Sequence, residues 1–287
     1  MLNDIKTYSS FFCKLGESPI WIGGRNCFLW LDILNKCVFE KPINTQSKDY
    51  FQKWQFAYTP TAIIPSVSDP DFVWIVTDKG VYCIDLQNGV KQIIAEVDIP
   101  ETHRTNDGSA GPDGTLYFGT MQWAPDGRNG RLYSFNRDGY LKELPIMTGI
   151  PNTFVWIDSS HVAISDSFYR KIDLYKADKA GLHHVEELYD FNGYGGEPDG
   201  GALDRDGMIW LALWGRGQIV CLDPTRKKIT QSIDLPVSRP TSCCFGGPEM
   251  DMLFVTSAVS EDTDTDPQGG QCFILEMKTP GTAPWSF

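Results

Sequence analysis

Short strand-like runs recur at a nearly constant interval along the chain, and this spacing constrains the fold more than any other feature of the sequence. Six runs rich in aromatic and β-branched residues begin at positions 28, 73, 116, 161, 208 and 252, so that successive runs lie 45, 43, 45, 47 and 44 residues apart. Residues of these types favour strands. A repeat of about 40–50 residues, with several strands in each unit, is typical of propeller blades. Six such units account for nearly all of the 287 residues.

The residues between these runs indicate several antiparallel strands in each unit. Second runs follow at 81–85, 132–136, 172–176 and 219–223, and Asp-Gly turns of the kind that suit tight hairpins precede some of the strands. We therefore predict an all-β fold, a six-bladed β-propeller with four-stranded antiparallel blades around a central channel, forming one domain over residues 1–287. The strand at 272–276 is expected to close the ring against the N-terminal segment, because closure removes free sheet edges. A sandwich with a small second domain would not repeat so evenly.

The charge and composition exclude several classes of partner. The formal net charge is −12 at pH 7, whereas binding to nucleic acid or to an anionic membrane surface needs a positively charged surface. The sequence contains no apolar stretch of the roughly 18 residues that a membrane helix needs, and its first residues do not resemble a signal peptide. We therefore expect a cytoplasmic protein that binds neither nucleic acid nor membrane. The eight cysteines lack the spacing of zinc knuckles and indicate buried reduced thiols.

Equivalent positions on the six blades favour a site at one end of the channel. The first strand of each propeller blade lines the axis, so matching residues of these strands crowd around one mouth. The matching residues, one before each repeat strand, are Glu17, Thr61, Asn106, Asn152, Asp199 and Thr241, separated by 44, 45, 46, 47 and 42 residues. Asn and Asp also favour turns, so any one of them alone is weak evidence. Four amide or carboxylate side chains in register are stronger evidence.

Oxygen donors from four blades that converge on one axis form a site suited to a hard cation. Glu17 and Asp199 would balance a divalent charge, and the amides of Asn106 and Asn152 would add neutral ligands. Without a cation the two carboxylates would repel each other, and one would tend to stay protonated. We expect one divalent metal ion, with Ca²⁺ first and Zn²⁺, Mg²⁺ or Mn²⁺ as alternatives that the same ligands accept.

Five short segments resemble the SMP-30/gluconolactonase family, which includes regucalcin-like sugar lactonases and luciferin-regenerating enzyme-like proteins. The resemblance runs from about residue 12 to the C-terminal strand, so it covers nearly the whole chain, and the five segments occur in the family's order and spacing. The segments are Leu15-Gly16-Glu17-Ser18-Pro19-Ile20-Trp21, Arg104-Thr105-Asn106-Asp107-Gly108, Gly119-Thr120-Met121, Pro198-Asp199-Gly200 and Thr241-Ser242-Cys243-Cys244-Phe245-Gly246-Gly247.

The resemblance implies a metal-dependent lactonase that opens a small sugar lactone, an aldonolactone, to its aldonic acid. The family's metal ligands fall on Glu17, Asn152 and Asp199, with Asn106 lining the metal pocket. Its sugar-contacting element falls on Arg104 and Asn106, and its general base falls on Asp199. The metal would polarise the lactone carbonyl, and Trp123 is a candidate wall for the sugar face, although a rim or core position suits a tryptophan equally well.

Two departures from the family pattern bear on substrate choice and leave other functions open. Thr153 stands where the family usually has glycine after the ligand Asn, and Gln122-Trp123-Ala124 replaces the acidic residues that some members use to hold sugar hydroxyls. The alternatives are a non-catalytic calcium-binding or regulatory propeller and an esterase or organophosphate hydrolase on the same scaffold. Arg104 beside the site favours an enzyme, since structural metal binding needs no neighbouring cation. A closed ring has no edge that must pair, so we expect a monomer or weak homo-oligomer.

Overall fold

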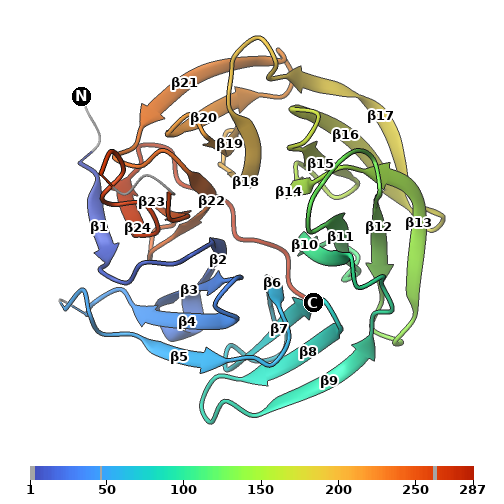
Figure 1. Ribbon diagram of the computed structural model, residues 1–287, viewed down its shortest axis with the longest axis horizontal. Coiled ribbons are helices and arrows are strands. Elements are labelled where there is room, and N and C mark those ends of the chain that lie inside the picture. The colour runs from blue at the N-terminus through green and yellow to red at the C-terminus, as the bar shows by residue number, and fades with distance from the viewer. Residues whose placement is uncertain (1–3, 46, 261–263) are drawn as a thin grey trace.

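The chain folds into six four-stranded antiparallel sheets arranged as a ring around a central channel (Figure 1). This computed structural model describes residues 4–45, 47–260 and 264–287. The innermost strands of neighbouring sheets pack against one another all the way around the ring, from the first sheet to the sixth and back to the first. The predicted fold class, an all-β six-bladed propeller, is therefore confirmed.

Each blade runs outward from the channel. In the order of the chain, blades 1 to 3 consist of β2 (Gly16–Ile22), β3 (Cys27–Asp32), β4 (Cys37–Pro42) and β5 (Gln52–Gln55); β6 (Pro60–Pro65), β7 (Phe72–Thr77), β8 (Gly80–Asp85) and β9 (Lys91–Glu96); and β10 (His103–Ala110), β11 (Leu116–Gln122), β12 (Gly130–Phe135) and β13 (Leu141–Thr148). A short 3-10 helix, η1 (Gly23–Arg25), follows β2.

Blades 4 to 6 repeat the same order. They consist of β14 (Pro151–Trp156), β15 (His161–Asp166), β16 (Lys171–Asp178) and β17 (Gly181–Asp190); β18 (Glu197–Leu203), β19 (Ile209–Trp214), β20 (Gln218–Asp223) and β21 (Lys228–Asp234); and β22 (Pro240–Gly246), β23 (Met252–Ser257), β24 (Cys272–Glu276) and β1 (Lys6–Ser9). The six repeat strands of the sequence are the second strands of the six blades. The second runs at 81–85, 132–136, 172–176 and 219–223 lie largely in the third strands of blades 2 to 5.

The ring closes between the two ends of the chain. Strand β24 pairs with β23 on one side and with the N-terminal strand β1 on the other, so the sixth blade contains strands from both ends (Figure 1). This confirms the predicted closure, and it pairs an edge that β24 would otherwise expose.

Apolar side chains fill the wedges between neighbouring blades. The wedge between blades 6 and 1 is the most aromatic, with Phe28, Trp30 and Phe254 fully buried together. The adjacent residues Cys243 and Cys244 point into two different wedges, as alternation along a strand requires. All eight cysteines are free thiols, and only Cys83 is partly exposed.

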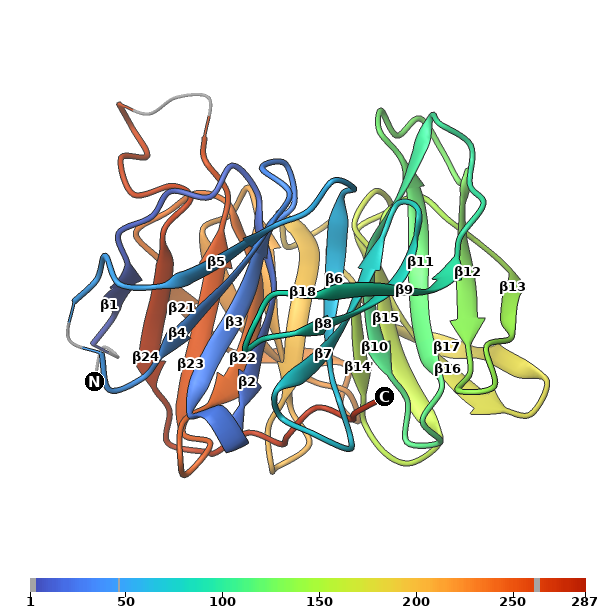
Figure 2. The ribbon, with the colours of Figure 1, turned by 90° about the horizontal axis from the view of Figure 1, so that it is seen from below.

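The two faces of the ring differ. The described residues between β23 and β24 (258–260 and 264–271) lie on one face, and the segment after β24 runs across the channel on the other (Figure 2). Gly281 donates to Met250 O, and Phe287 exchanges backbone hydrogen bonds with Pro65 and Val67. The ring of Phe287 is buried between blades 2 and 3, against Trp74 and Phe135. This segment therefore covers one end of the channel.

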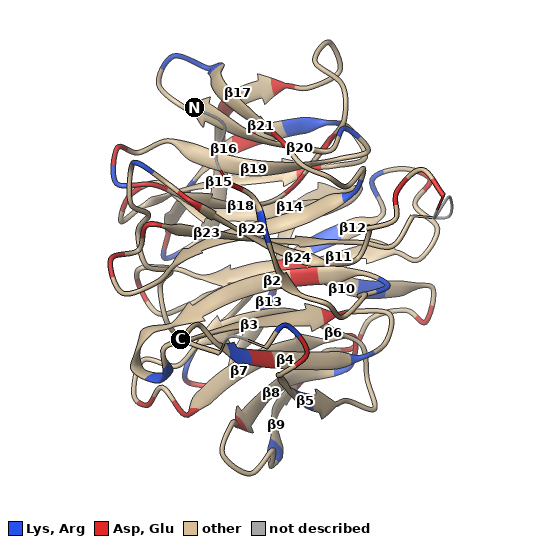
Figure 3. Ribbon diagram, turned by 90° about the vertical axis from the view of Figure 1, so that its left-hand side faces the viewer, with Lys and Arg blue, Asp and Glu red and all other residues tan. Residues whose placement is uncertain are grey.

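Charges are spread over the surface rather than gathered into one basic field. On the side seen in Figure 3, Lys and Arg alternate with Asp and Glu along strand edges and loops. Among residues 4–45, 47–260 and 264–287, no helix is long and apolar enough to cross a membrane.

Candidate active site

A β-bulge in each of the six inner strands forms the scaffold of the site. The register of every inner strand shifts by one residue at the same level, between Glu17 and Ile20, Pro60 and Ala62, Thr105 and Gly108, Asn152 and Val155, Pro198 and Gly201, and Pro240 and Ser242. A bulge bends its strand and re-aims the side chains beside it. The six predicted positions lie at these bulges, on the face opposite the C-terminal segment.

The carboxyl groups of Glu17 and Asp199 meet at this level. Both side chains are buried, and the two carboxyl groups lie close enough for each to shift the pKa of the other. Burial raises the pKa of Glu17 to about 7, although the Ser18 amide and Arg104 oppose the shift. Burial and the charge of Glu17 raise the pKa of Asp199 well above its usual range. These shifts favour a protonated acid when no cation is bound, and a divalent cation would compete with that proton.

Two amides and a guanidinium form a chain beside this pair. Asn106 Nδ2 donates to Asn152 Oδ1 at 2.8 Å and to Pro151 O at 2.9 Å, and Asn106 Oδ1 accepts from Arg104 Nη1 at 2.6 Å. Burial lowers the pKa of Arg104 to about 10, although Glu17 and Asp199 act in the opposite direction. In this arrangement Asn106 orients the Asn152 amide, and Arg104 orients Asn106.

Sequence reasoning missed two supports of the site, Ser167 and the hydroxyl of Thr153. Asn152 Nδ2 donates to Ser167 Oγ at 2.8 Å, and Ser167 Oγ donates to Pro198 O at 2.6 Å, which ties Asn152 to the strand of Asp199. Ser167 follows β15 with no motif around it, so only the tertiary structure identifies it. Thr153 Oγ1 donates to Asp199 O at 2.6 Å and lies 2.8 Å from Ser165 Oγ.

The Thr153 backbone adopts a conformation that disfavours threonine. Its φ is +81°, in the left-handed region where a β-branched residue is strained. Glycine would adopt this backbone conformation without strain, and the hydroxyl contacts of Thr153 offset part of the strain here.

We expect Thr153→Val, which keeps the branched shape and removes the hydroxyl, to lower the free energy of unfolding by about 1–3 kcal/mol, because Asp199 O loses a buried donor. Thr153→Ser, which keeps the hydroxyl, is the matched control and should cost less. Urea denaturation measures both. Equal stability of the two variants would show that the inter-blade hydrogen bond contributes nothing.

The donor set fits a hard divalent cation. The two buried carboxyl groups lie in contact, and the amide oxygen of Asn152 is held in the same chain of polar groups, which is the chemistry that Ca²⁺ or Mg²⁺ prefers. Among the described residues, no group of three or more His, Cys, Asp or Glu side chains is arranged to hold a metal ion. A cation here would therefore depend on amide oxygens and water as well as the carboxylates.

The two remaining equivalent positions of the ring, Thr61 and Thr241, are not part of this donor set. The Thr61 hydroxyl is hydrogen-bonded to Thr105 Oγ1, and the Thr241 hydroxyl donates to Gly16 O.

Trp123 lies on the rim rather than in the core. It follows β11 directly, is 46% exposed, and its ring centroid lies 5.5 Å from Arg104 Cζ. The ring therefore covers one face of the guanidinium.

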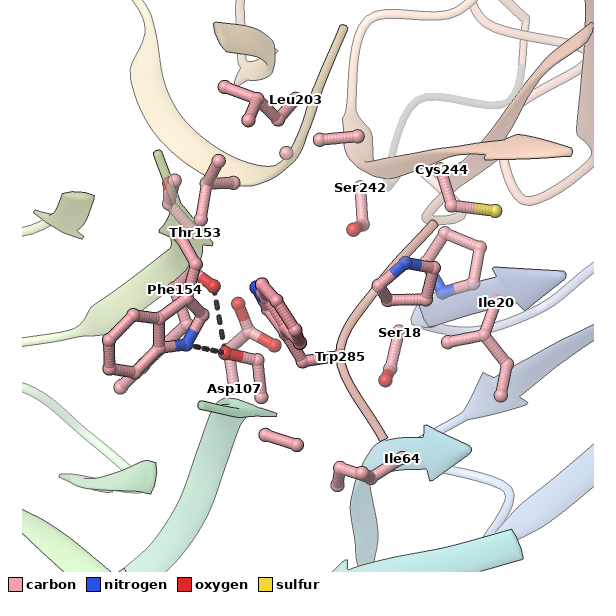
Figure 4. Close-up of a pocket in the computed structure, with 18 of the residues that line it drawn as sticks. Ser18, Ile20, Ile64, Asp107, Thr153, Phe154, Leu203, Ser242, Cys244 and Trp285 are labelled. Carbon is pink, nitrogen blue, oxygen red and sulfur yellow. Dashed lines mark hydrogen bonds between the residues drawn. The ribbon is translucent and has the colours of Figure 1, made fainter. Parts of the chain in front are cut away.

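Beneath the bulges the channel widens into a cavity of about 130 Å³. Asp107, Thr153 and Ser242 line it on the side of the site, and Thr282, Pro284 and Trp285 of the C-terminal segment line the opposite end (Figure 4). Burial raises the pKa of Asp107 well above its usual range, and the charge of Glu17 adds to this effect. The C-terminal segment lines one end of the cavity, and the carboxylate pair lies at the opposite mouth.

Comparison with known proteins gives one consistent result. A family model described as the SMP-30/Gluconolactonase/LRE-like region matches residues 15–259. A Bacillus subtilis (strain 168) protein named "Putative sugar lactone lactonase YvrE" is 28% identical over 95% of this chain and 94% of its own length. Human regucalcin is 30% identical over 96% of this chain and 95% of its own length. The crystal structure of regucalcin from Agrobacterium tumefaciens, described as a calcium-binding protein, superposes with a TM-score of 0.89 at 25% identity, over 98% of this chain and 96% of that one.

Proposed function

Because the chain belongs to the SMP-30/gluconolactonase/LRE-like family, we propose that it hydrolyses a sugar lactone to the open aldonic acid with the help of one divalent metal ion. The family includes gluconolactonases, and the Bacillus subtilis relative carries a sugar lactone lactonase name. The observation that carries the proposal is the buried contact between Glu17 and Asp199 beside Arg104, at one mouth of the channel. Two buried acids next to a cation are costly for stability alone, which favours a functional role.

Each residue has a distinct role in the proposed reaction. Glu17, Asn152 and Asp199 would hold the cation, and Asn106 lines this pocket by orienting the Asn152 amide. When bound, the cation supplies Lewis-acid stabilisation of the negative charge that develops on the carbonyl oxygen. Asp199 accepts a proton from the attacking water as the water oxygen bonds to the carbonyl carbon. The ring C–O bond then breaks, and Asp199 returns the proton to the departing ring oxygen, which becomes a hydroxyl group. Arg104, with Asn106, positions the lactone oxygens, and the Trp123 ring covers one face of the substrate.

Geometry favours a proton acceptor at Asp199 over one at Glu17. Glu17 accepts from the Ser18 amide at 2.9 Å, which holds one of its oxygens in place. The backbone oxygen of Asp199 accepts from Thr153, which anchors its main chain without engaging the carboxylate.

Ca²⁺ is our first choice of ion because the ligands are oxygen atoms and include an amide. The related Agrobacterium tumefaciens structure is also described as a calcium-binding protein.

Removal of the metal tests the proposal directly. We expect protein treated with chelator to hydrolyse D-glucono-1,5-lactone, D-xylonolactone and L-arabinonolactone no faster than buffer alone, and each added divalent ion to restore the catalysed rate to a different degree. Acid release followed with a pH indicator measures this. Turnover that persists after the metal has been removed, as checked by elemental analysis, would contradict the metal-dependent reaction.

A calcium-binding propeller without catalysis is the second candidate, supported by the description of the Agrobacterium tumefaciens protein. It predicts metal binding with no turnover of any lactone. An esterase or organophosphate hydrolase predicts turnover of aryl esters in preference to lactones. The same assay with an aryl ester added therefore separates all three.

A further inference from the structure

A second arginine, Arg239, occupies in blade 6 the position that Arg104 occupies in blade 3. The residues two before the six bulge positions are Leu15, Thr59, Arg104, Ile150, Glu197 and Arg239. Only blades 3 and 6 have a cation there, and these two blades face each other across the ring (Figure 1). Arg239 is thus the counterpart of Arg104 on the opposite side of the mouth.

Both arginines are paired with a tryptophan. Arg239 Cζ lies 5.2 Å from the ring centroid of Trp214, and Arg104 Cζ lies 5.5 Å from that of Trp123. A guanidinium packed on an indole loses solvent from one face but keeps its N–H edge for hydrogen bonds, which preorganises it for carboxylate or phosphate.

The two arginines differ in what their N–H groups already bind. Arg104 is buried, and its Nη1 donates hydrogen bonds to Asn106 Oδ1 and to Thr105 O. Arg239 is half-buried, and its Nη1 donates to Val259 O at 3.4 Å, a long hydrogen bond. Within the described part of the chain, no carboxylate lies at ion-pair distance from Arg239. Its guanidinium therefore retains donors for a ligand.

Trp214 lies next to the strand that carries Asp199. Trp214 is paired in register with Glu197, two residues before Asp199. Glu197 is the acid nearest this pair along the strand, and Arg170 Nη2 lies 3.4 Å from its Oε1, so its charge is partly balanced. Trp123 and Gln122 occupy the opposite rim, where no acidic residue directly follows Met121.

We infer that Arg239, held on Trp214, forms an anion-binding subsite that selects sugar lactones carrying a carboxylate or phosphate at the end remote from the reacting carbonyl. This inference rests on the proposed function for the reaction itself. Arg104 and the cation engage the lactone group on one side of the mouth, and the charged end of the sugar reaches Arg239 on the other. The protein as a whole is negatively charged and repels anions at long range. Arg239 therefore acts on a bound anion through direct contact, at distances where the rest of the charge is screened.

Binding of the product acids tests the subsite without requiring turnover. Isothermal titration in Ca²⁺-containing buffer compares D-gluconate, which lacks a second anionic group, with D-glucarate and with 6-phospho-D-gluconate. We expect the unaltered protein to bind one of the two acids that carry a second anionic group at least about tenfold more tightly than D-gluconate, since a hydrogen bond to a charged group contributes at that level. Preference for D-glucarate identifies a carboxylate subsite, and preference for 6-phospho-D-gluconate identifies a phosphate subsite.

Arg239→Gln should abolish this preference, and Arg239→Lys should restore only part of it, because lysine keeps the charge but not the planar fork. Arg137→Gln is the matched control, since Arg137 also lies over an aromatic ring, that of Phe287, in the wedge between blades 2 and 3. It should leave the preference unchanged. Equal affinities of the unaltered protein for all three acids, or a preference that survives in Arg239→Gln, would overturn the subsite. Failure to hydrolyse any lactone would instead overturn the proposed reaction, and the titrations would still decide the subsite.

Discussion

Asp199→Asn is expected to lower metal-dependent lactone hydrolysis by about 10²–10⁴-fold while the protein remains folded. The asparagine amide cannot accept the proton of the attacking water, although it has nearly the same shape as the carboxyl group. The fold should survive because the inter-blade contact at this position uses the backbone oxygen of Asp199, which accepts from Thr153. Initial rates of acid release with saturating metal measure the loss.

Stability of the metal-free variant provides an independent readout. Burial and the charge of Glu17 disfavour ionisation of Asp199, so a neutral amide at this position relieves a cost that Arg104 offsets only in part. We expect the metal-free Asp199→Asn protein to be at least as stable to heat as the unaltered metal-free protein, and to gain less stability from added metal. Asp138→Asn, at an exposed turn between β12 and β13, is the control for a general effect of lost charge. If Asp199→Asn kept more than a tenth of the activity, Asp199 would not be the general base.

Phe254→Ala is expected to lower the free energy of unfolding by about 3–5 kcal/mol, the largest stability effect that we predict. Phe254 is fully buried where the ring closes, and its ring stacks on Phe28 with centroids 4.7 Å apart and lies edge-on to Tyr8 at 5.2 Å. Tyr8 is on β1, the strand that completes blade 6, so the cavity would open beside the joint between the two ends of the chain.

Two further variants separate packing from other effects. Phe254→Leu keeps much of the buried volume and should cost less than the alanine variant. Phe12→Ala removes a phenylalanine that is 48% exposed and should change stability by no more than about 0.5 kcal/mol. Guanidinium denaturation monitored by tryptophan fluorescence compares the three. If Phe254→Ala were as stable as Phe12→Ala, the closing blade would not be packed as described.

Local patterns account for what could be predicted from the sequence. Strand alternation and turn residues act over a few positions, so the second strands of all six blades and the closing strand at 272–276 were readable without any tertiary information. The period of these strands also identified the six bulge positions, because a repeated unit places equivalent residues at equivalent points of a ring. The family resemblance added the roles expected of Glu17, Arg104 and Asp199, which remain predictions until tested.

The individual hydrogen bonds between blades could not be predicted, because they depend on how neighbouring blades pack. The repeat predicted that Glu17 and Asp199 converge, but not that Asn106 donates to Asn152 or that Ser167 bridges Asn152 to Pro198. The left-handed backbone of Thr153 follows from the bulge, not from the residue, since threonine alone disfavours it. Sequence periodicity thus determined the ring and the level of the site, whereas only the packing of the six blades decided which polar atoms meet there.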